Sequence, residues 1–191
     1  MNRCTHQRGF SLIEVLVTLV IVTVALLSSA ALQLLSKRSN YDAAQRTTAA
    51  HLAEDLLERM RNNSGSLLDY VPMAPLGGAT QAAPAADCGD PATICTAAEM
   101  ATYDLWQWEQ LLDGALETTA GQATGGLVSP AACIQGPVFG GNGVYRVAIA
   151  WRGMTDIANP VVDNCGEASG DYGAGDAYRR VLVVQSFIND I

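Results

Sequence analysis

The chain has 191 residues, a formal net charge of −8 at pH 7 and 49% hydrophobic residues. This acidic balance disfavours nonspecific binding to nucleic acid or to an anionic lipid surface, because both need a basic protein surface. The length suits one small domain joined to an extended segment.

The first predicted element is an apolar helix that follows a short basic segment. From Val15 to Ser36 there are 22 residues with no charge, no Pro and no Gly, and a helix needs about 20 such residues to cross a bilayer core. The pattern therefore predicts one membrane span. Glu14 stands at the edge of the apolar run, where an unpaired charge costs about 2.5 to 3.5 kcal/mol. We therefore expect Glu14 to have a partner of opposite charge.

The stretch GFSLIEVLVTLVIVTVALL, residues 9–27, resembles the N-terminal motif of type IV pilins and pseudopilins. In that motif a basic leader ends in Gly, a Phe follows, and a Glu stands five positions after the Gly, as Gly9, Phe10 and Glu14 do here. The resemblance implies that a prepilin peptidase cuts between Gly9 and Phe10 and that the new Phe10 amine is methylated. It also implies that Glu14 orients each subunit against the N-terminal amine of a neighbour during fibre assembly. The alternative is a pair within one chain, because its own Phe10 amine lies four positions before Glu14.

Two simpler interpretations of this segment stay open. The first is an ordinary secretory signal or a simple anchor, although the apolar core of a signal would be shorter and its cleavage site would follow that core. The second concerns Glu14 alone, which could be an interfacial carboxylate that reaches the lipid head groups.

Beyond the span, the sequence predicts that the same helix continues with one apolar face. A stripe at helical spacing consists of Ala49, Leu52, Ala53, Leu56, Leu57 and Met60. We expect the helix to run from Phe10 to about Asn62. The predicted segments are a leader at 1–9, a transmembrane half at 10–35, a periplasmic amphipathic half at 36–63 and a globular domain at 64–191.

The globular part begins with a proline-rich stretch, residues 66–94, which lacks periodicity and is expected to be a loop. Thr96 and Glu99 then match a capping box, which predicts a second helix that ends near Gly114. Its apolar stripe includes Trp108. Trp106 lies on another side of this helix, so either the proline-rich loop covers its ring or the ring is an exposed docking group.

The last third of the chain changes to the period of a strand. Residues 144–151 alternate in polarity and 178–188 are rich in β-branched residues, which predicts two strands. A shorter strand between Leu127 and Phe139 is interrupted by prolines, which favours a sheet edge. Residues 153–177 form a long acidic, Gly-rich connection that is either functional or stapled by its cysteine. The expected fold is α+β and type IV pilin-like, with a small antiparallel sheet packed on the amphipathic half of the long helix.

Four cysteines follow the span: Cys88, Cys95, Cys133 and Cys165. An even number after a membrane anchor fits an oxidising periplasm, although four cysteines allow three connectivities. We expect Cys88 to pair with Cys95 and Cys133 with Cys165. Zinc binding is the alternative, but the spacings lack the paired short intervals of zinc sites.

A search for catalytic or metal-binding groups finds little. His51 falls among polar positions of the long helix, which favours a solvated side chain. The acidic residues Asp163, Glu167, Asp171 and Asp176 could bind calcium, but their spacing matches no EF-hand and favours a solvated loop. We therefore expect no catalytic activity, no cofactor and no metal.

Three features together make the whole chain similar to the PilV-type minor pilins, also called type IV pilus modification proteins. They are the SLIEVLV start, the D-L-x-x-W pattern from Asp104 to Trp108 and the strand V-A-I-A-W that ends at Trp151. The resemblance implies a minor pilin that takes part in assembling or priming a type IV pilus. Its partners would be other minor and major pilins, the prepilin peptidase and the inner-membrane assembly platform, without nucleic acid. Its place would be the inner membrane, as a single-pass protein with a periplasmic domain, or the pilus itself.

Two alternatives to this function remain. The first is a minor pseudopilin of a type II secretion system, which shares the N-terminal motif. The second is a membrane-anchored periplasmic binding domain that does not polymerise.

Overall fold

A computed structural model describes residues 9–115, 117–120, 122–123 and 125–189. The chain divides into two compact units, residues 1–40 and 41–191, and each is described by itself. Residues 1–8 of the expected leader lie outside the described residues.

The first unit consists of the apolar part of α1 (Leu12–Asn62). The helix begins two residues after the expected start at Phe10, and the Ser11 carbonyl accepts the first helical bonds, from Glu14 N at 3.0 Å and from Val15 N at 3.2 Å. Every described side chain of this unit is exposed. Its mean hydropathy reaches 2.6, so by length and composition the helix is able to cross a membrane.

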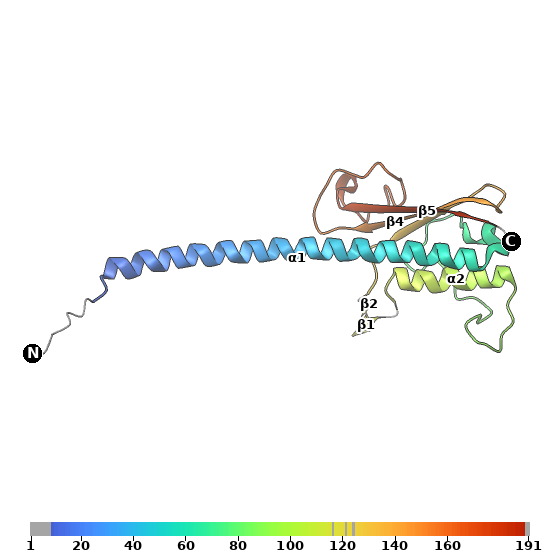
Figure 1. Ribbon diagram of the computed structural model, residues 1–191, viewed down its shortest axis with the longest axis horizontal. Helices are drawn as coiled ribbons and strands as arrows, with labels where there is room; N and C mark the ends of the chain where they lie inside the picture. Colours follow the sequence, from blue (N-terminus) through green and yellow to red (C-terminus); the bar gives the residue numbers. More distant parts are fainter. Residues whose placement is uncertain (1–8, 116, 121, 124, 190–191) are drawn as a thin grey trace, which may run out of the picture. The chain divides into compact units, whose positions relative to one another are not determined.

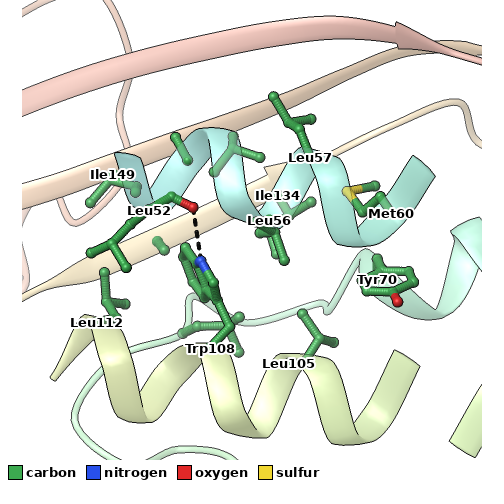
Figure 2. Close-up of a cluster of buried hydrophobic side chains, with 14 of the residues drawn as sticks. Leu52, Leu56, Leu57, Met60, Tyr70, Leu105, Trp108, Leu112, Ile134 and Ile149 are labelled. Atoms are coloured by element: carbon green, nitrogen blue, oxygen red, sulfur yellow. Dashed lines mark hydrogen bonds between the residues drawn. The ribbon is translucent and has the colours of Figure 1, made fainter. Parts of the chain in front are cut away.

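In the second unit, the remainder of α1 supplies one side of the hydrophobic core. The helix buries the predicted stripe against the sheet on one side and against a second helix, α2 (Ala97–Leu112), on the other (Figures 1 and 2). The buried residues of α1 are Gln45, Ala49, Leu52, Ala53, Leu56, Leu57 and Met60. The amphipathic stripe that the sequence predicts is therefore the centre of the domain core.

The sheet has three antiparallel strands in the order β3 (Ala131–Gln135), β4 (Gly143–Arg152) and β5 (Arg179–Ile188). The register is regular, with Ala132 opposite Ile149 and Ile149 opposite Leu182. The short strand lies at the edge, as its prolines predict, and Leu76 of the proline-rich stretch bridges Ala132 on its outer side. The long helix packed against this sheet confirms the expected α+β fold.

The second helix begins with the predicted capping box. The Glu99 N–H donates to the Thr96 hydroxyl, while the Glu99 carboxylate accepts the Thr96 N–H at 2.8 Å. The helix packs on α1 through Trp108, whose indole Nε1 donates to the Leu52 carbonyl at 2.8 Å (Figure 2). Trp106 is half-buried and lines a hollow together with Pro84, so the proline-rich loop borders the same hollow as its side chain.

Four short elements are absent from the sequence prediction. The stretch expected to be a loop starts with a 3-10 helix, η1 (Ser64–Tyr70), and the long connection contains another, η2 (Ala174–Asp176). A small hairpin of β1 (Thr118–Thr119) and β2 (Gln122–Ala123) follows α2. These segments are too short to show a periodic pattern, which explains why periodicity does not reveal them.

Candidate processing and assembly site

The predicted cleavage junction lies just before the first turn of α1. Among the described residues other than its chain neighbours, no atom lies within 4 Å of a Cβ added at Gly9, and the Phe10 side chain is 84% exposed. Neither residue belongs to the helix. The bond between them is therefore sterically open to a peptidase.

Glu14 is the acidic residue in the first turn of α1, where the positive end of the helix dipole favours a carboxylate. Its side chain is exposed and has no hydrogen bond or ion pair with any described residue. The next charged residue along the helix is Lys37. Because Phe10 lies outside the helix, regular helical spacing does not hold its nitrogen against the Glu14 carboxylate in the uncleaved chain.

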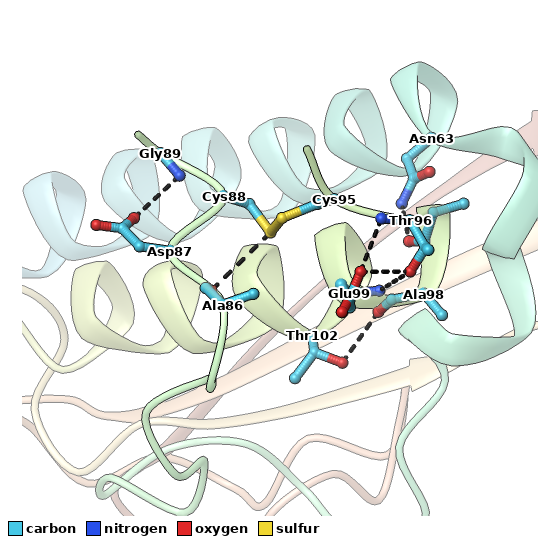
Figure 3. Close-up of a disulfide and its surroundings, with 11 residues drawn as sticks. Asn63, Ala86, Asp87, Cys88, Gly89, Cys95, Thr96, Ala98, Glu99 and Thr102 are labelled. Atoms are coloured by element: carbon cyan, nitrogen blue, oxygen red, sulfur yellow. Dashed lines mark hydrogen bonds between the residues drawn. A yellow bond between two sulfur atoms is a disulfide. The ribbon is translucent and has the colours of Figure 1, made fainter. Parts of the chain in front are cut away.

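The four cysteines form two disulfides in the structure. Cys88 joins Cys95 with 5.9 Å between the Cα atoms, and Cys133 joins Cys165 with 5.8 Å. The first closes a small loop directly before the capping box of α2 (Figure 3). Asn63, at the end of α1, donates to the Ala97 carbonyl at 2.8 Å, so this loop leads into a helix start that is already bonded to α1.

The second disulfide holds the long connection, residues 153–177, against the sheet. Cys133 lies opposite Ala148 in the register, and Cys165 is 2% exposed. Both Ala148 and Ala150 are buried, although the alternation predicts that they face away from the helix. The stapled connection therefore covers this face of the sheet.

We expect loss of the second disulfide to destabilise the domain more than loss of the first. Replacing both Cys133 and Cys165 with Ser should lower the free energy of unfolding by about 2 to 4 kcal/mol, because the unfolded chain regains the freedom of a longer loop. The matched control replaces both Cys88 and Cys95 with Ser. The disulfide that it removes joins residues only 7 apart in the sequence, whereas Cys133 and Cys165 are 32 apart. Nonreducing peptide mapping checks the pairing and thermal unfolding checks the ranking; equal losses would contradict it.

The D-L-x-x-W pattern on α2 faces α1 at both of its ends. The Asp104 carboxylate accepts a hydrogen bond from Arg59 at 3.0 Å and another from the Tyr70 hydroxyl. Burial and this carboxylate raise the pKa of Tyr70 above its ordinary value. Since Trp108 bonds the backbone of α1 at the other end of the pattern, these residues fix how α2 sits on α1.

Two carboxylates, Glu109 on α2 and Asp113 at the C-cap of this helix, hold the loop at residues 77–81, and sequence reasoning missed both of them. Glu109 is fully buried and accepts the backbone N–H groups of Gly77, Thr80 and Gln81 at 2.7, 2.9 and 2.7 Å, and the Thr80 hydroxyl as well. One turn later, Asp113 accepts the N–H groups of residues 78 and 79 at 2.9 and 2.8 Å. Five consecutive N–H groups thus point at two carboxylates, an arrangement that we call the carboxylate clasp.

The backbone of the clasp depends on glycine. Gly77 has φ +125°, and a Cβ there would lie 2.3 Å from the Pro130 carbonyl oxygen. Gly78 has φ +76°, in the left-handed region that glycine adopts at low cost. Two signals could have revealed the clasp: the Gly77-Gly78 pair shortly after Pro75, and two acidic residues one turn apart at the end of the next helix.

A buried arginine organises the long connection, and sequence reasoning missed it too. Arg179, at the start of β5, is 1% exposed and donates to the carbonyls of Cys165, Pro160 and Asp163 at 2.6, 2.7 and 2.9 Å. Its Nε donates to the Asn159 side chain at 2.8 Å. Arg179 and Arg180 are adjacent in a strand and so point to opposite faces, which is the signal that one of them lies beneath the connection.

The sequence favours a solvated acidic connection, but the structure buries two of its acidic residues, Asp163 and Asp176. Asp163 is 9% exposed and forms an ion pair with Arg146 at 2.9 Å, while the buried Asp176 accepts the Ala168 N–H at 2.9 Å. Glu167 accepts from the Asn159 amide at 3.1 Å. Among the described residues, no three His, Cys, Asp or Glu side chains cluster closely enough to hold a metal ion. His51 is exposed on α1.

Comparison with known families covers the N-terminal half of the chain. Residues 4–30 match the prokaryotic N-terminal methylation motif, and residues 31–106 match the family described as type IV pilin Tt1218. No curated protein and no solved structure matches the chain. The two family matches adjoin, and together they include the junction at Gly9, the whole of α1 and the start of α2. The chain therefore belongs to the type IV pilin family with an N-terminal methylation motif, a family of structural and non-enzymatic proteins.

Proposed function

We propose that this chain is a minor pilin of the PilV type that takes part in assembling or priming a type IV pilus. The observation that carries the proposal is the exposed apolar part of α1, which begins just after Gly9-Phe10 and holds Glu14 as its one charge before Lys37. An apolar helix whose side chains are all exposed needs lipid or a bundle of similar helices around it. Its carboxylate needs a positively charged partner in either setting. A subunit stored in the membrane and later inserted in a fibre meets both needs.

A minor role is favoured over a major one by the continuity of α1. Major pilins often carry a proline that softens the apolar half of the helix, whereas α1 runs from Leu12 to Asn62 without one. We place the protein in the inner membrane, with α1 as its single span and the disulfide-bonded domain in the periplasm. Other minor and major pilins, the prepilin peptidase and the assembly platform are its proposed partners.

The junction is tested by changing Gly9. We expect mass spectrometry of the membrane-extracted protein to find a methylated N-terminus at Phe10. Gly9→Leu should leave the leader attached, because a peptidase site shaped for glycine has no room for the new side chain. Gly65→Leu, at a position that is also open to solvent, is the matched control and should be processed normally. A Met1 start in the unaltered chain, in a host with the peptidase, would refute the assignment.

The role of Glu14 is tested by its incorporation into fibres. Glu14→Ala should be processed and inserted normally but should appear in sheared fibres at less than a tenth of the normal level. The reason is that a carboxylate in a dry helical bundle needs the amine of a neighbouring Phe10, and this pair sets the axial register. Glu54→Ala, an exposed acid on the second-unit part of α1, is the control and should incorporate fully. Normal incorporation of Glu14→Ala would leave Glu14 without an assembly role.

The same fibre fractions, together with a protein-secretion assay, separate the alternatives. A minor pseudopilin would be processed in the same way but would be required for protein secretion rather than for surface pili. An anchored binding domain would remain in the membrane fraction, and Glu14→Ala would then change nothing in the sheared material.

A further inference from the structure

A hollow of about 260 Å³ lies in the second unit, between α2 and the proline-rich loop. We call it the aromatic hollow, because the side chains of Tyr103 and Trp106 on α2 line it. The loop contributes one charged residue, Asp87, and the short apolar residues Ala83, Pro84 and Ala86. Drug-sized ligands fill pockets of about 300 to 1,000 Å³, so the smaller volume of this hollow suits a small organic group.

The two aromatic rings of the hollow are close enough for one group to contact both. The ring centroids of Tyr103 and Trp106 are 5.9 Å apart, and the ring planes are inclined at 51°. Both side chains are only half-buried, whereas Trp108, two positions later, is buried in the core. The face of an aromatic ring is electronegative and attracts a cation within about 6 Å of its centroid. A single cation in the hollow is therefore within reach of both rings.

Asp87 brings a negative charge to the same place. It forms no ion pair with any described residue, and its Oδ1 accepts the Gly89 N–H at 3.0 Å, which holds the side chain in a turn (Figure 3). A Cβ added at Gly89 would lie 2.4 Å from the Tyr103 hydroxyl and 3.2 Å from this Oδ1, so the carboxylate stands beside the Tyr103 side chain. No residue from Asn62 to Tyr145 is a Lys, Arg or His. Neither α2 nor the loop therefore brings a cation of its own to the hollow.

We infer that the aromatic hollow binds a quaternary ammonium group. The cation lies against the rings of Tyr103 and Trp106, the Asp87 carboxylate balances its charge, and its methyl groups contact the short apolar side chains of the loop. A primary ammonium fits less well, because it needs acceptors for three N–H groups and the side chains that line the hollow supply one carboxylate. Recognition of a quaternary ammonium by aromatic faces needs no hydrogen bond to the ligand.

The indole N–H resonances report binding directly, since the chain has three Trp residues. The full chain, labelled with 15N in its indoles and held in uncharged maltoside micelles, is titrated with choline. Trp106→Phe identifies the resonance of the hollow. We expect a saturable shift of the Trp106 resonance and no shift of the Trp108 resonance. Dimethylbutanol, the uncharged isostere in which carbon replaces the ammonium nitrogen, should shift neither.

Two variants test the role of the carboxylate. Asp87→Asn keeps the oxygen that accepts the Gly89 N–H but removes the charge, and it should weaken the apparent affinity for choline by about ten-fold. Asp90→Asn is the matched control, because Asp90 makes the same kind of turn in the same loop, with its Oδ1 accepting the Ala92 N–H at 2.9 Å, but does not line the hollow. Its affinity should be unchanged, and the Trp108 resonance confirms that both variants are folded.

Three results would each overturn the proposal. They are the absence of a saturable Trp106 shift with choline, an equal shift with dimethylbutanol, and equal affinities in Asp87→Asn and Asp90→Asn.

Nanodiscs identify the source of the quaternary ammonium. If a lipid head group fills the hollow, the Trp106 resonance in phosphatidylcholine discs stands at the choline-bound position before choline is added, and in phosphatidylglycerol discs it does not. If the ligand is a free organic cation, the resonance stays at the unbound position in both kinds of disc and moves only with choline.

Discussion

Replacing Glu109 with Gln should lower the free energy of unfolding by about 3 kcal/mol. The change keeps the size of the side chain but removes the charge and turns one acceptor oxygen into an NH2 donor. That donor would face the N–H groups of Gly77, Thr80 or Gln81, which now bond the two carboxylate oxygens of a fully buried side chain. Unpaired buried donors on both sides explain a loss larger than that of one hydrogen bond.

Asp113→Asn is the matched control for this variant. It makes the same chemical change four residues later, at the C-cap of α2, but its bonds to the Gly78 and Ala79 N–H groups are exposed, and water can replace them. Its cost should be below about 1 kcal/mol. Thermal unfolding of the full chain in uncharged detergent, followed by near-UV circular dichroism, compares the two variants. Equal losses would show that burial of Glu109 does not matter.

The same carboxylate makes the domain sensitive to acid. Burial by itself would raise the pKa of Glu109, but hydrogen bonds from the Thr80 hydroxyl and from three backbone N–H groups outweigh burial and lower it. In the unfolded chain a Glu titrates near pH 4.3. The stabilisation from Glu109 is therefore complete above about pH 4.3 and is lost as the pH falls through its lower folded value. The Gln variant lacks this part of the pH dependence.

Replacing Arg179 with Ala should cost about 3 to 5 kcal/mol, because several acceptors lose their donor and each buried acceptor left unpaired costs about 1 to 3 kcal/mol. The guanidinium binds the connection at residues 159–165 through one amide and three carbonyl oxygens. The bonds to the Cys165 and Asp163 carbonyls are buried, so these two acceptors would remain buried and unpaired. Hydrogen exchange at residues 159–165 should rise together with the fall in melting temperature.

Two further variants of this site distinguish its geometry from its charge. Arg179→Lys keeps the charge, but one ammonium cannot reach acceptors spread over the span of a guanidinium, so most of the stability should still be lost. Arg152→Ala, on the neighbouring strand, removes a bond to the Asp171 carbonyl and a contact with the Tyr178 ring, both near the surface. It should cost no more than about 1 kcal/mol. A larger loss in Arg152→Ala than in Arg179→Ala would contradict this account.

The elements with a long periodic pattern were predictable from the sequence. The stripe from Ala49 to Met60 repeats over several turns, and Thr96 and Glu99 mark a helix start through bonds between near neighbours. The alternation from Tyr145 to Trp151 likewise fixes which side chains of β4 face the helix. In each case the determining contacts are local, or they repeat often enough for the period to be visible.

The clasp and the arginine site were not predictable in the same way. The Gly77 N–H reaches an acceptor on Glu109, and Arg179 reaches carbonyls as far back as Pro160, so the determining contacts are distant in sequence and do not repeat. Loops of this kind are held by single side chains, and a buried charged residue looks the same in the sequence as a solvated one. The expectation of a solvated acidic connection was wrong at Asp163 and Asp176 for this reason.

The way in which α1 and the sheet share one core has a consequence for the time course of folding. Leu52 and Leu56 belong to the same core cluster as Val147 and Ile149. The ribosome adds these two strand residues roughly ninety positions later in the chain. During synthesis from the N-terminus, the apolar stripe of α1 therefore stays uncovered until β4 and β5 exist. The Cys88–Cys95 loop can close early, whereas the core closes last, so the waiting helix is the part of the nascent chain that most needs protection from aggregation.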